Sequence, residues 1–211
     1  MAPLSEIERR VGAYYTGKLR EHGATHRGVD WNSVESQRTR FEELLRVVDR
    51  THPFSINDWG CGYGALADHL AAEGASFTYA GYDIAEAMVE AARVRMPQHT
   101  FTAVAEELPV ADVTVASGIF NVLAGTAEQD WGEYVRSTVR AMRAKSRRGI
   151  AFNMLTSYSD AHKMVPELHY ADPCTMFDWC KRELSRHVSL LHDYGLWEFT
   201  VIVRFEGAGA Q

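Results

Sequence analysis

A run of seven residues from Asp58 to Gly64, with the sequence Asp-Trp-Gly-Cys-Gly-Tyr-Gly, has the residue types and spacing of a ligand-binding turn. It follows a strand-like run at Phe54–Asn57 and precedes a helical pattern at Ala65–Ala72. Three glycines at alternate positions leave little side-chain bulk, so a ligand can approach the backbone amides at the start of the helix. The carboxylate of Asp58 would add negative charge that faces this ligand. The turn therefore favours a cationic or amine-bearing ligand over a pyrophosphate.

A second carboxylate, Asp83, ends the next strand-like segment, 19 residues after Gly64. A carboxylate at that place can accept hydrogen bonds from both hydroxyls of a ribose. Ile84 would then pack against the edge of an adenine. Asp83 could also cap the helix that is expected at Ala85–Met96. Taken together with the glycine turn, the position favours ribose binding.

Strand-like and helix-like segments alternate along the chain, and this order predicts how the two carboxylates are positioned. We expect helices at Glu35–Arg50, Ala65–Gly74, Ala85–Met96, Gln129–Lys145 and Met176–Ser185, and strands at Phe54–Asp58, Ser76–Tyr82, His99–Ala105, Asp112–Ile119, Gly149–Leu155, Val188–His192 and Trp197–Phe205. The alternation predicts an α/β fold with a doubly wound, mostly parallel seven-stranded sheet. A tight turn between the last two strands predicts a C-terminal antiparallel hairpin.

The glycine turn, written as D-x-G-C-G-x-G, resembles the first motif of class I S-adenosylmethionine-dependent methyltransferases. A dinucleotide-type G-x-G-x-x-G pattern can be forced onto Gly60, Gly62 and Ala65, but it leaves Asp58 and Gly64 without a role. The stretches GVDWN at 28–32, SGIFNV at 117–122 and HDYGLWEFTV at 192–201 are similar to a small bacterial single-domain subgroup of the same family. The resemblance implies a Rossmann-like methyltransferase fold with S-adenosylmethionine as the cofactor.

The segment before the first strand is too short for a separate domain. We therefore expect one domain over residues 1–211, with an N-terminal helical lid at 1–50 and a cofactor-binding core with a substrate cap at 51–206.

The resemblance also implies which residues surround the cofactor. Adenine recognition would fall to Glu106 or a backbone amide, unless Glu106 is simply solvated. Arg40 could pair with the cofactor carboxylate, or with Glu35 or Glu43 on the surface. Trp31 and Tyr15 could close over the methionine chain, or anchor the lid as core aromatics. The expected cofactor-binding residues are Asp58, Gly60, Cys61, Gly62, Asp83, Ile84, Glu106, Ser117, Gly118, Arg40, Trp31 and Tyr15.

The substrate side is expected at the carboxyl ends of the later strands and in the long connection at 157–173. Histidine can serve as a general base near neutral pH, and His192, followed by His169, is the expected catalytic residue. Each could instead be an ordinary hydrogen-bonded histidine, and His162, His169 and His192 do not form a pair on one helix face, so no metal is expected. Phe120 would face the sulfonium or lie in the core. The expected substrate residues are Phe120, Asn121, Asn153, Tyr170 and Tyr194.

Composition narrows the partners. The 211 residues carry a formal net charge of −6, which gives no electrostatic footprint for nucleic acid or an anionic membrane. Three cysteines, an odd number without metal-ligand spacing, suggest reduced thiols in a cytoplasmic protein. We expect a monomer or homodimer that acts on a small molecule.

These observations predict methyl transfer from S-adenosylmethionine to an oxygen or nitrogen of a small molecule. Two alternatives stay open. One is a non-catalytic S-adenosylmethionine-binding partner protein on the same fold. The other, less favoured by Asp58, is a nicotinamide-dependent oxidoreductase.

Overall fold

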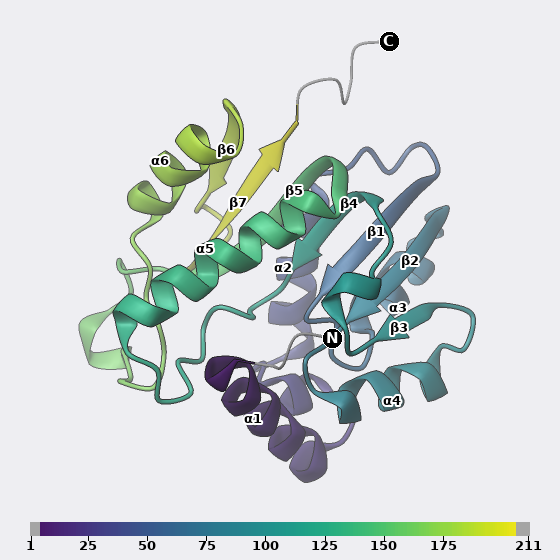
Figure 1. Ribbon diagram of the computed structural model, residues 1–211, viewed down its shortest axis with the longest axis horizontal. Coiled ribbons are helices and arrows are strands. Elements are labelled where there is room, and N and C mark those ends of the chain that lie inside the picture. Colours follow the sequence, from purple (N-terminus) through teal and green to yellow (C-terminus); the bar gives the residue numbers. More distant parts are fainter. Residues whose placement is uncertain (1–4, 206–211) are drawn as a thin grey trace.

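A computed structural model describes residues 5–205 and shows a seven-stranded sheet flanked by helices (Figure 1). The strand order is β3-β2-β1-β4-β5-β7-β6. The strands are β1 (Phe54–Trp59), β2 (Phe77–Tyr82), β3 (Thr100–Thr102), β4 (Ala111–Ala116), β5 (Ser146–Leu155), β6 (His187–Leu191) and β7 (Glu198–Arg204). Strand β7 pairs antiparallel with both β5 and β6, and the other neighbouring strands pair in parallel. The predicted fold class, including the terminal hairpin, is confirmed.

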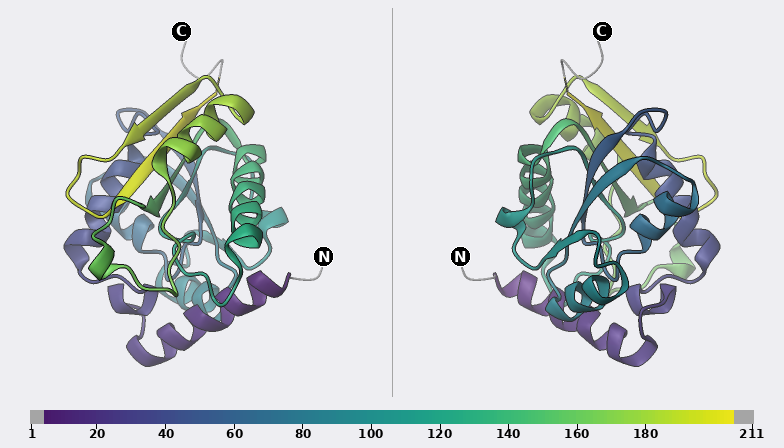
Figure 2. Two further views of the ribbon diagram at one scale, coloured as in Figure 1. Left: turned by 90° about the vertical axis from the view of Figure 1, so that its left-hand side faces the viewer. Right: turned by 90° about the vertical axis from the view of Figure 1, so that its right-hand side faces the viewer.

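Helices cover both faces of this sheet (Figure 2). On one face lie α2 (Val34–Leu45), α3 (Ala65–Ala72) and α4 (Glu86–Arg95), whose apolar side chains share a core cluster with β1, β2 and β4. On the other lie α5 (Glu128–Ala144) and α6 (Pro173–Glu183). In α5, Trp131, Val135 and Val139 recur on one helical face and are almost fully buried. The strands between these layers are correspondingly apolar, as expected of a mostly parallel sheet.

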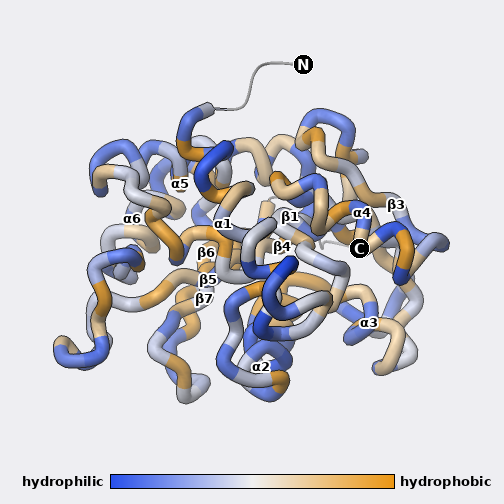
Figure 3. Tube along the Cα trace, turned by 90° about the horizontal axis from the view of Figure 1, so that it is seen from below, coloured by the Kyte–Doolittle hydropathy of each residue, from blue (hydrophilic) through white to orange (hydrophobic). Residues whose placement is uncertain are grey.

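The N-terminal segment divides into two parts. Helix α1 (Glu6–His22) starts at a capping box formed by Ser5 and Glu8 and lies across the carboxyl ends of β1 and β4 (Figure 3). A short 3-10 helix, η1 (His26–Val29), follows it. Helix α2, by contrast, packs into the core, where Leu44 and Leu45 have no exposed surface. Residues 5–50 therefore form a cover in part and pack into the core in part, instead of forming a lid throughout.

Several element boundaries differ from the predicted ones. Helix α2 ends at Leu45 instead of Arg50, and β3 covers only three residues. Strand β4 ends at Ala116, because the chain turns at Gly118, which has φ 72°. Helix α6 begins earlier than predicted, since Asp172 caps it by accepting from the Thr175 amide at 2.7 Å. Two short 3-10 helices, η2 (Ala105–Glu107) and η3 (Ala161–Lys163), complete the described chain.

No helix within residues 5–205 has the length and the apolar character needed to cross a membrane.

Candidate active site

The glycine turn joins the end of β1 to the start of α3, at the point where β1 and β4 lie side by side and the strand order reverses. The amides of Gly60 and Cys61 both donate to the Tyr82 carbonyl oxygen at the end of β2, at 2.7 and 2.9 Å. Gly60 has φ 81° and Gly64, the N-cap residue of α3, has φ 86°, a region that residues with a side chain rarely adopt. The two glycines fold the chain back so that the turn borders a cavity at the topological switch point, where α/β sheets bind ligands.

This cavity, which we call the glycine-turn pocket, is partly open to solvent. Helix α1, η1 and α2 close it on one side, and the carboxyl ends of β1, β2 and β4 close it on the other. Of the predicted cofactor residues it is lined by Asp58, Gly60, Cys61, Gly62, Asp83, Ile84, Ser117, Trp31 and Tyr15. Nine of the twelve residues predicted to bind the cofactor therefore line this pocket.

Two buried carboxylates face the glycine-turn pocket. Asp58 is 3% exposed and accepts a hydrogen bond from the Tyr79 hydroxyl at 2.7 Å. Asp83 is 8% exposed and accepts from the amides of Gly62 (2.8 Å) and Ala85 (2.9 Å). No Lys, Arg or His side chain of the described chain forms an ion pair with either. Burial raises the pKa of Asp58 to about 7 and the pKa of Asp83 to about 6, because water no longer stabilises the charged forms. The pocket thus concentrates negative charge that this part of the chain leaves unbalanced.

One hydroxyl in the pocket is also unpaired. The Ser117 Oγ atom is buried and has no hydrogen-bond partner among the described residues. A buried polar atom without a partner costs free energy, and in a pocket it marks a place for a ligand group. The unpaired hydroxyl and the two carboxylates give the pocket a polar wall opposite its aromatic cover.

A second hollow, which we call the Glu198 pocket, adjoins the first and shares Tyr15, Val29 and Trp31 with it. Its other lining residues include Asp30, Asn32, Arg40, Gly118, Asn121 and Glu198. Trp31 lies against Gly118 so closely that an added Cβ there would stand 2.1 Å from the Trp31 Cη2 atom. Trp31 therefore forms part of the partition between the two pockets.

A buried ion pair supports the Glu198 pocket. Arg40 donates through Nε to both carboxylate oxygens of Glu198 (3.0 and 2.9 Å) and through Nη2 to one of them. The Arg40 guanidinium also lies over the Trp31 ring, 3.9 Å from its centroid. Asn153 donates to Glu198 at 2.6 Å and accepts from the Gly118 amide at 2.7 Å. Arg40 therefore fixes the Trp31 ring, and Asn153 links Glu198 to the Gly118 amide.

Three cofactor predictions need revision. Glu106 lies exposed on η2, does not line the glycine-turn pocket, and is therefore poorly placed to read adenine. Arg40 is buried against Glu198, so the alternative of a surface pair with Glu35 or Glu43 is wrong. Arg40 and Gly118 line the Glu198 pocket rather than the glycine-turn pocket.

The predicted substrate residues separate in the same way. Asn121 lines the Glu198 pocket and accepts from the Leu155 amide at 3.2 Å. Phe120 has no exposed surface and packs edge-to-face on Phe152, so the core interpretation is correct and the substrate interpretation is wrong. Asn153 is 1% exposed, with both ends of its amide bonded, and supports the pocket instead of lining it.

The two predicted tyrosines lie outside both pockets. The Tyr170 hydroxyl accepts from the Val165 amide at 3.1 Å, and the Tyr194 hydroxyl is 3.1 Å from Thr200 Oγ1. Both hydroxyls thus stabilise loops rather than the site.

The two catalytic histidines differ in position. His192 is exposed, packs near Tyr158 and Phe199, and lines neither pocket, so it is not placed to act as the base. His169 does not line either pocket, but its backbone amide donates at 2.8 Å to the carbonyl of Asn121, which lines the Glu198 pocket. Its Nδ1 atom is buried and has no hydrogen-bond partner within residues 5–205, and burial lowers the pKa of its imidazole.

Sequence reasoning missed Asp30 and Glu198. Asp30 accepts from the Tyr14 hydroxyl at 2.6 Å, pairs with Lys18 at 2.7 Å and borders the Glu198 pocket. Glu198 could have been noticed as a carboxylate at the start of a mostly apolar strand, β7. In the structure its side chain is 1% exposed. Both residues lie in stretches that resemble the bacterial subgroup, GVDWN at 28–32 and HDYGLWEFTV at 192–201, but the resemblance gave neither of them a role.

Known proteins are similar to this chain in sequence and in fold. The family described as "Methyltransferase domain" matches residues 56–145, which include the glycine turn. A Mycobacterium tuberculosis protein named "Putative methyltransferase Rv1506c" is 50% identical over 163 residues, covering 76% of this chain and 98% of that protein. In fold, the chain is similar to the magnesium protoporphyrin IX methyltransferase of Synechocystis with bound SAM (TM-score 0.61, 14% identity, 96% of this chain and 99% of that one). It is equally similar to the 1,6-didemethyltoxoflavin-N1-methyltransferase of Burkholderia thailandensis (TM-score 0.61, 14% identity, 97% and 92%).

The sheet order, the terminal hairpin and the glycine turn define a class I methyltransferase fold. The chain belongs to the methyltransferase family, as its 50% identity to the mycobacterial protein shows.

Proposed function

We propose that the protein transfers a methyl group from S-adenosylmethionine to an oxygen or nitrogen of a small molecule. The observation that carries this proposal is the pair of buried carboxylates, Asp58 and Asp83, in a pocket where the described chain gives them no cationic partner. S-adenosylmethionine offers an ammonium group, a sulfonium group and two ribose hydroxyls, which suit an acidic wall.

The residues present fit this cofactor. Asp83 uses one oxygen for each of two amides, and a carboxylate oxygen can accept more than one hydrogen bond, so ribose hydroxyls can still be bound. Asp58 would stabilise the ammonium group, and the Ser117 hydroxyl would gain a partner. When bound, the cofactor supplies an already activated methyl group. The protein's part is then to hold donor and acceptor in line and to exclude water.

We place the methyl acceptor in the Glu198 pocket. It shares Tyr15, Val29 and Trp31 with the glycine-turn pocket, so a molecule there would lie beside the cofactor. Asn121, Asn32 and Asp30 offer amide and carboxylate groups that could orient a polar acceptor. Proteins with this fold include a magnesium protoporphyrin IX methyltransferase and a 1,6-didemethyltoxoflavin-N1-methyltransferase, and this supports a small molecule as the acceptor here.

His169 is the histidine that we propose as the proton acceptor. Its backbone amide is bonded to Asn121, which lines the Glu198 pocket, and its Nδ1 atom has no partner within the described chain that would compete for a proton. Burial lowers the pKa of the imidazole, which favours the neutral form that a base requires. We expect His169→Ala to lower kcat by about 100-fold with unchanged cofactor affinity. His162→Ala, on the same loop but exposed, is the matched control. Equal activity of the two variants would remove His169 from the mechanism.

The three cysteines, all within the described chain, are free thiols, which supports a reducing compartment such as the cytoplasm. We propose a monomer or homodimer with no nucleic-acid partner, in keeping with the net charge of −6.

Calorimetric titration tests the cofactor. We expect S-adenosylhomocysteine to bind wild-type protein and Asp83→Ala to weaken that binding at least tenfold. Binding of a reduced nicotinamide nucleotide, with none of S-adenosylhomocysteine, would contradict the proposal. A mass-spectrometric screen for acceptors that gain one methyl group would then separate an enzyme from a non-catalytic binding protein.

A further inference from the structure

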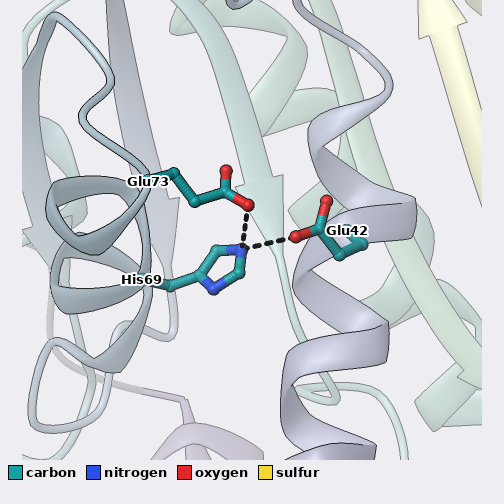
Figure 4. Close-up of side chains that lie close together, drawn as sticks. All are labelled: Glu42, His69 and Glu73. Carbon is teal, nitrogen blue, oxygen red and sulfur yellow. Dashed lines mark ion pairs between the residues drawn. The ribbon is translucent and has the colours of Figure 1, made fainter.

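Three side chains outside the candidate active site converge between α2 and α3 (Figure 4). Glu42 projects from α2, and His69 projects from α3, followed by Glu73 immediately beyond that helix, four residues later. The His69 Nε2 atom lies 3.0 Å from Glu42 Oε1 and 3.7 Å from Glu73 Oε1. One nitrogen and two carboxylate oxygens thus face a common point, with all three atoms within 4.8 Å of one another.

His69 is the least expected member of this cluster. Its side chain is 10% exposed, and the Phe41 ring packs 5.6 Å from the imidazole centroid and limits its rotation. Nε2 is buried and makes no hydrogen bond within the described part of the chain, although it lies near both carboxylates. Neither oxygen is placed where an Nε2–H group would donate to it. The nitrogen is therefore aimed between the two oxygens rather than at either one.

This off-axis arrangement matches the edges of a metal coordination shell. Ligand atoms about 2.0–2.2 Å from a zinc ion stand about 3.4 Å apart at the tetrahedral angle and about 3.0 Å apart at a right angle. The two nitrogen–oxygen separations, 3.0 and 3.7 Å, are close to these values, and the two oxygens lie within 4.8 Å of each other. Both glutamates are about one-third exposed, so water can reach the cluster and complete the coordination.

Arg50 orients the two carboxylates. Its Nη1 atom pairs with Glu73 Oε2, and its Nη2 atom pairs with Glu42 Oε2 at 3.2 Å. Each glutamate therefore gives its second oxygen to Arg50 and keeps Oε1 for the common point. Outer hydrogen bonds of this kind fix metal-binding carboxylates in many sites.

We propose that Glu42, His69 and Glu73 bind one divalent transition-metal ion of the zinc type. One imidazole with two carboxylates is a mixed donor set that suits such ions better than Mg²⁺ or Ca²⁺. The ion would fasten α2 to α3. Helix α2 carries Gln37 and Phe41, which line the glycine-turn pocket, so the ion would stabilise one wall of that pocket. The site does not depend on the proposed methyl transfer.

The test is calorimetric titration of ZnCl₂ into tag-free protein that has been stripped with a chelator. We expect one ion per chain, bound at micromolar concentration or below, and a rise of about 5 °C in Tm at saturating zinc. His69→Gln and Glu42→Gln should each weaken binding at least 100-fold and remove the Tm rise. Arg50→Gln should weaken it by about tenfold. His52→Gln, which changes an exposed histidine paired with Asp49, is the matched control and should bind like wild type.

Two measurements keep the outcome clear. Circular dichroism without metal establishes whether each variant is folded. If His69→Gln does not fold, Glu42→Gln alone tests the loss of zinc binding. CoCl₂ replaces zinc as a spectroscopic probe of the ligands. Binding no tighter than 100 µM, or unchanged affinity in both ligand variants, would overturn the proposal. A cobalt–thiolate band that persists in both variants would also overturn it, since the exposed Cys174 would then be the ligand.

Discussion

Within residues 5–205, buried carboxylates occur at two places, and their hydrogen-bond and ion-pair partners differ. Near β5 and β7, Glu198 is matched by Arg40 and Asn153. At the ends of β1 and β2, Asp58 and Asp83 receive hydroxyl and amide hydrogen bonds but no cation from the described residues. A matched charge can be held by the fold alone, whereas an unmatched pair destabilises the free protein and is relieved by a cationic ligand. The contrast separates a carboxylate that the fold itself neutralises, Glu198, from two carboxylates, Asp58 and Asp83, that a ligand can neutralise.

Removing the matching cation is the largest perturbation that the comparison predicts. Arg40→Met would leave Glu198 buried without its partner, and we expect a loss of about 3–5 kcal/mol in the free energy of unfolding. Denaturant unfolding measures it. Arg46→Met, at the C-cap of the same helix, changes an arginine that is 54% exposed in its pair with Glu43 and should cost less than about 1 kcal/mol. Similar losses in the two variants would mean that the Glu198 pair is no more than a surface contact.

At Asp58 the comparison predicts a gain in the free energy of unfolding instead of a loss. Asp58→Asn removes an unmatched charge and can still accept from Tyr79, so the unliganded protein should gain on the order of 2 kcal/mol of stability at pH 8. The same variant should bind S-adenosylmethionine about 100-fold more weakly. Asp68→Asn, an exposed carboxylate on α3, is the control for both measurements. A destabilised variant with normal affinity would refute the unmatched-charge account.

The raised pKa values also predict a pH dependence of stability. An unfolded Asp loses its proton near pH 3.9. In the folded protein the pKa of Asp83 is about 6 and the pKa of Asp58 is about 7. Between pH 4 and 7 the folded state therefore holds protons that the unfolded state has lost, and these two groups make stability fall as pH rises.

Two histidines oppose this trend. Burial lowers the pKa of His99 and His169, so their contribution to stability is present above pH 6.5 and is lost at lower pH. Comparing Asp58→Asn with wild type isolates the aspartate effect. The stability gain of the variant should be near zero at pH 4 and should grow until pH 7. A gain that does not vary with pH would contradict the raised pKa.

Ser117→Ala is the smallest change that we predict. The buried hydroxyl has no partner within the described chain, so its removal should not lower the free energy of unfolding and should lower cofactor affinity only by about 3- to 10-fold. Thr126→Ala, which removes another buried hydroxyl without a partner but lies outside both pockets, should leave affinity unchanged. Equal affinities for all three proteins would place the Ser117 hydroxyl outside the cofactor contacts.

The sequence predicted the carboxylates of the glycine-turn pocket but not the Arg40–Glu198 ion pair. The glycine turn and Asp83 were readable because their signal is local: glycine spacing, then a carboxylate at a strand end. Arg40 and Glu198 are 158 residues apart, and no local pattern links a helix arginine to a strand glutamate. Phe120 was ambiguous because an aromatic residue after a strand suits a pocket or a core equally well.

The histidines show the same limit. His192 follows β6, and its distance from both pockets depends on how the hairpin lies relative to the rest of the sheet. His69 and Glu73 do have a local signal, a histidine and a glutamate four residues apart. Their third neighbour, Glu42, comes from another helix, and only the packing of α2 on α3 brings it close.

Proton release on cofactor binding tests the central claim most directly. Calorimetric titration of S-adenosylmethionine at pH 6.5, in buffers of different ionisation enthalpy, counts the protons released for each ligand bound. If the ammonium group binds against Asp58 and the ribose hydroxyls bind Asp83, both contacts should favour the charged carboxylates and release close to one proton at pH 6.5. Tight binding without proton release at pH 6.5 would show that the ligand does not meet the unmatched carboxylates.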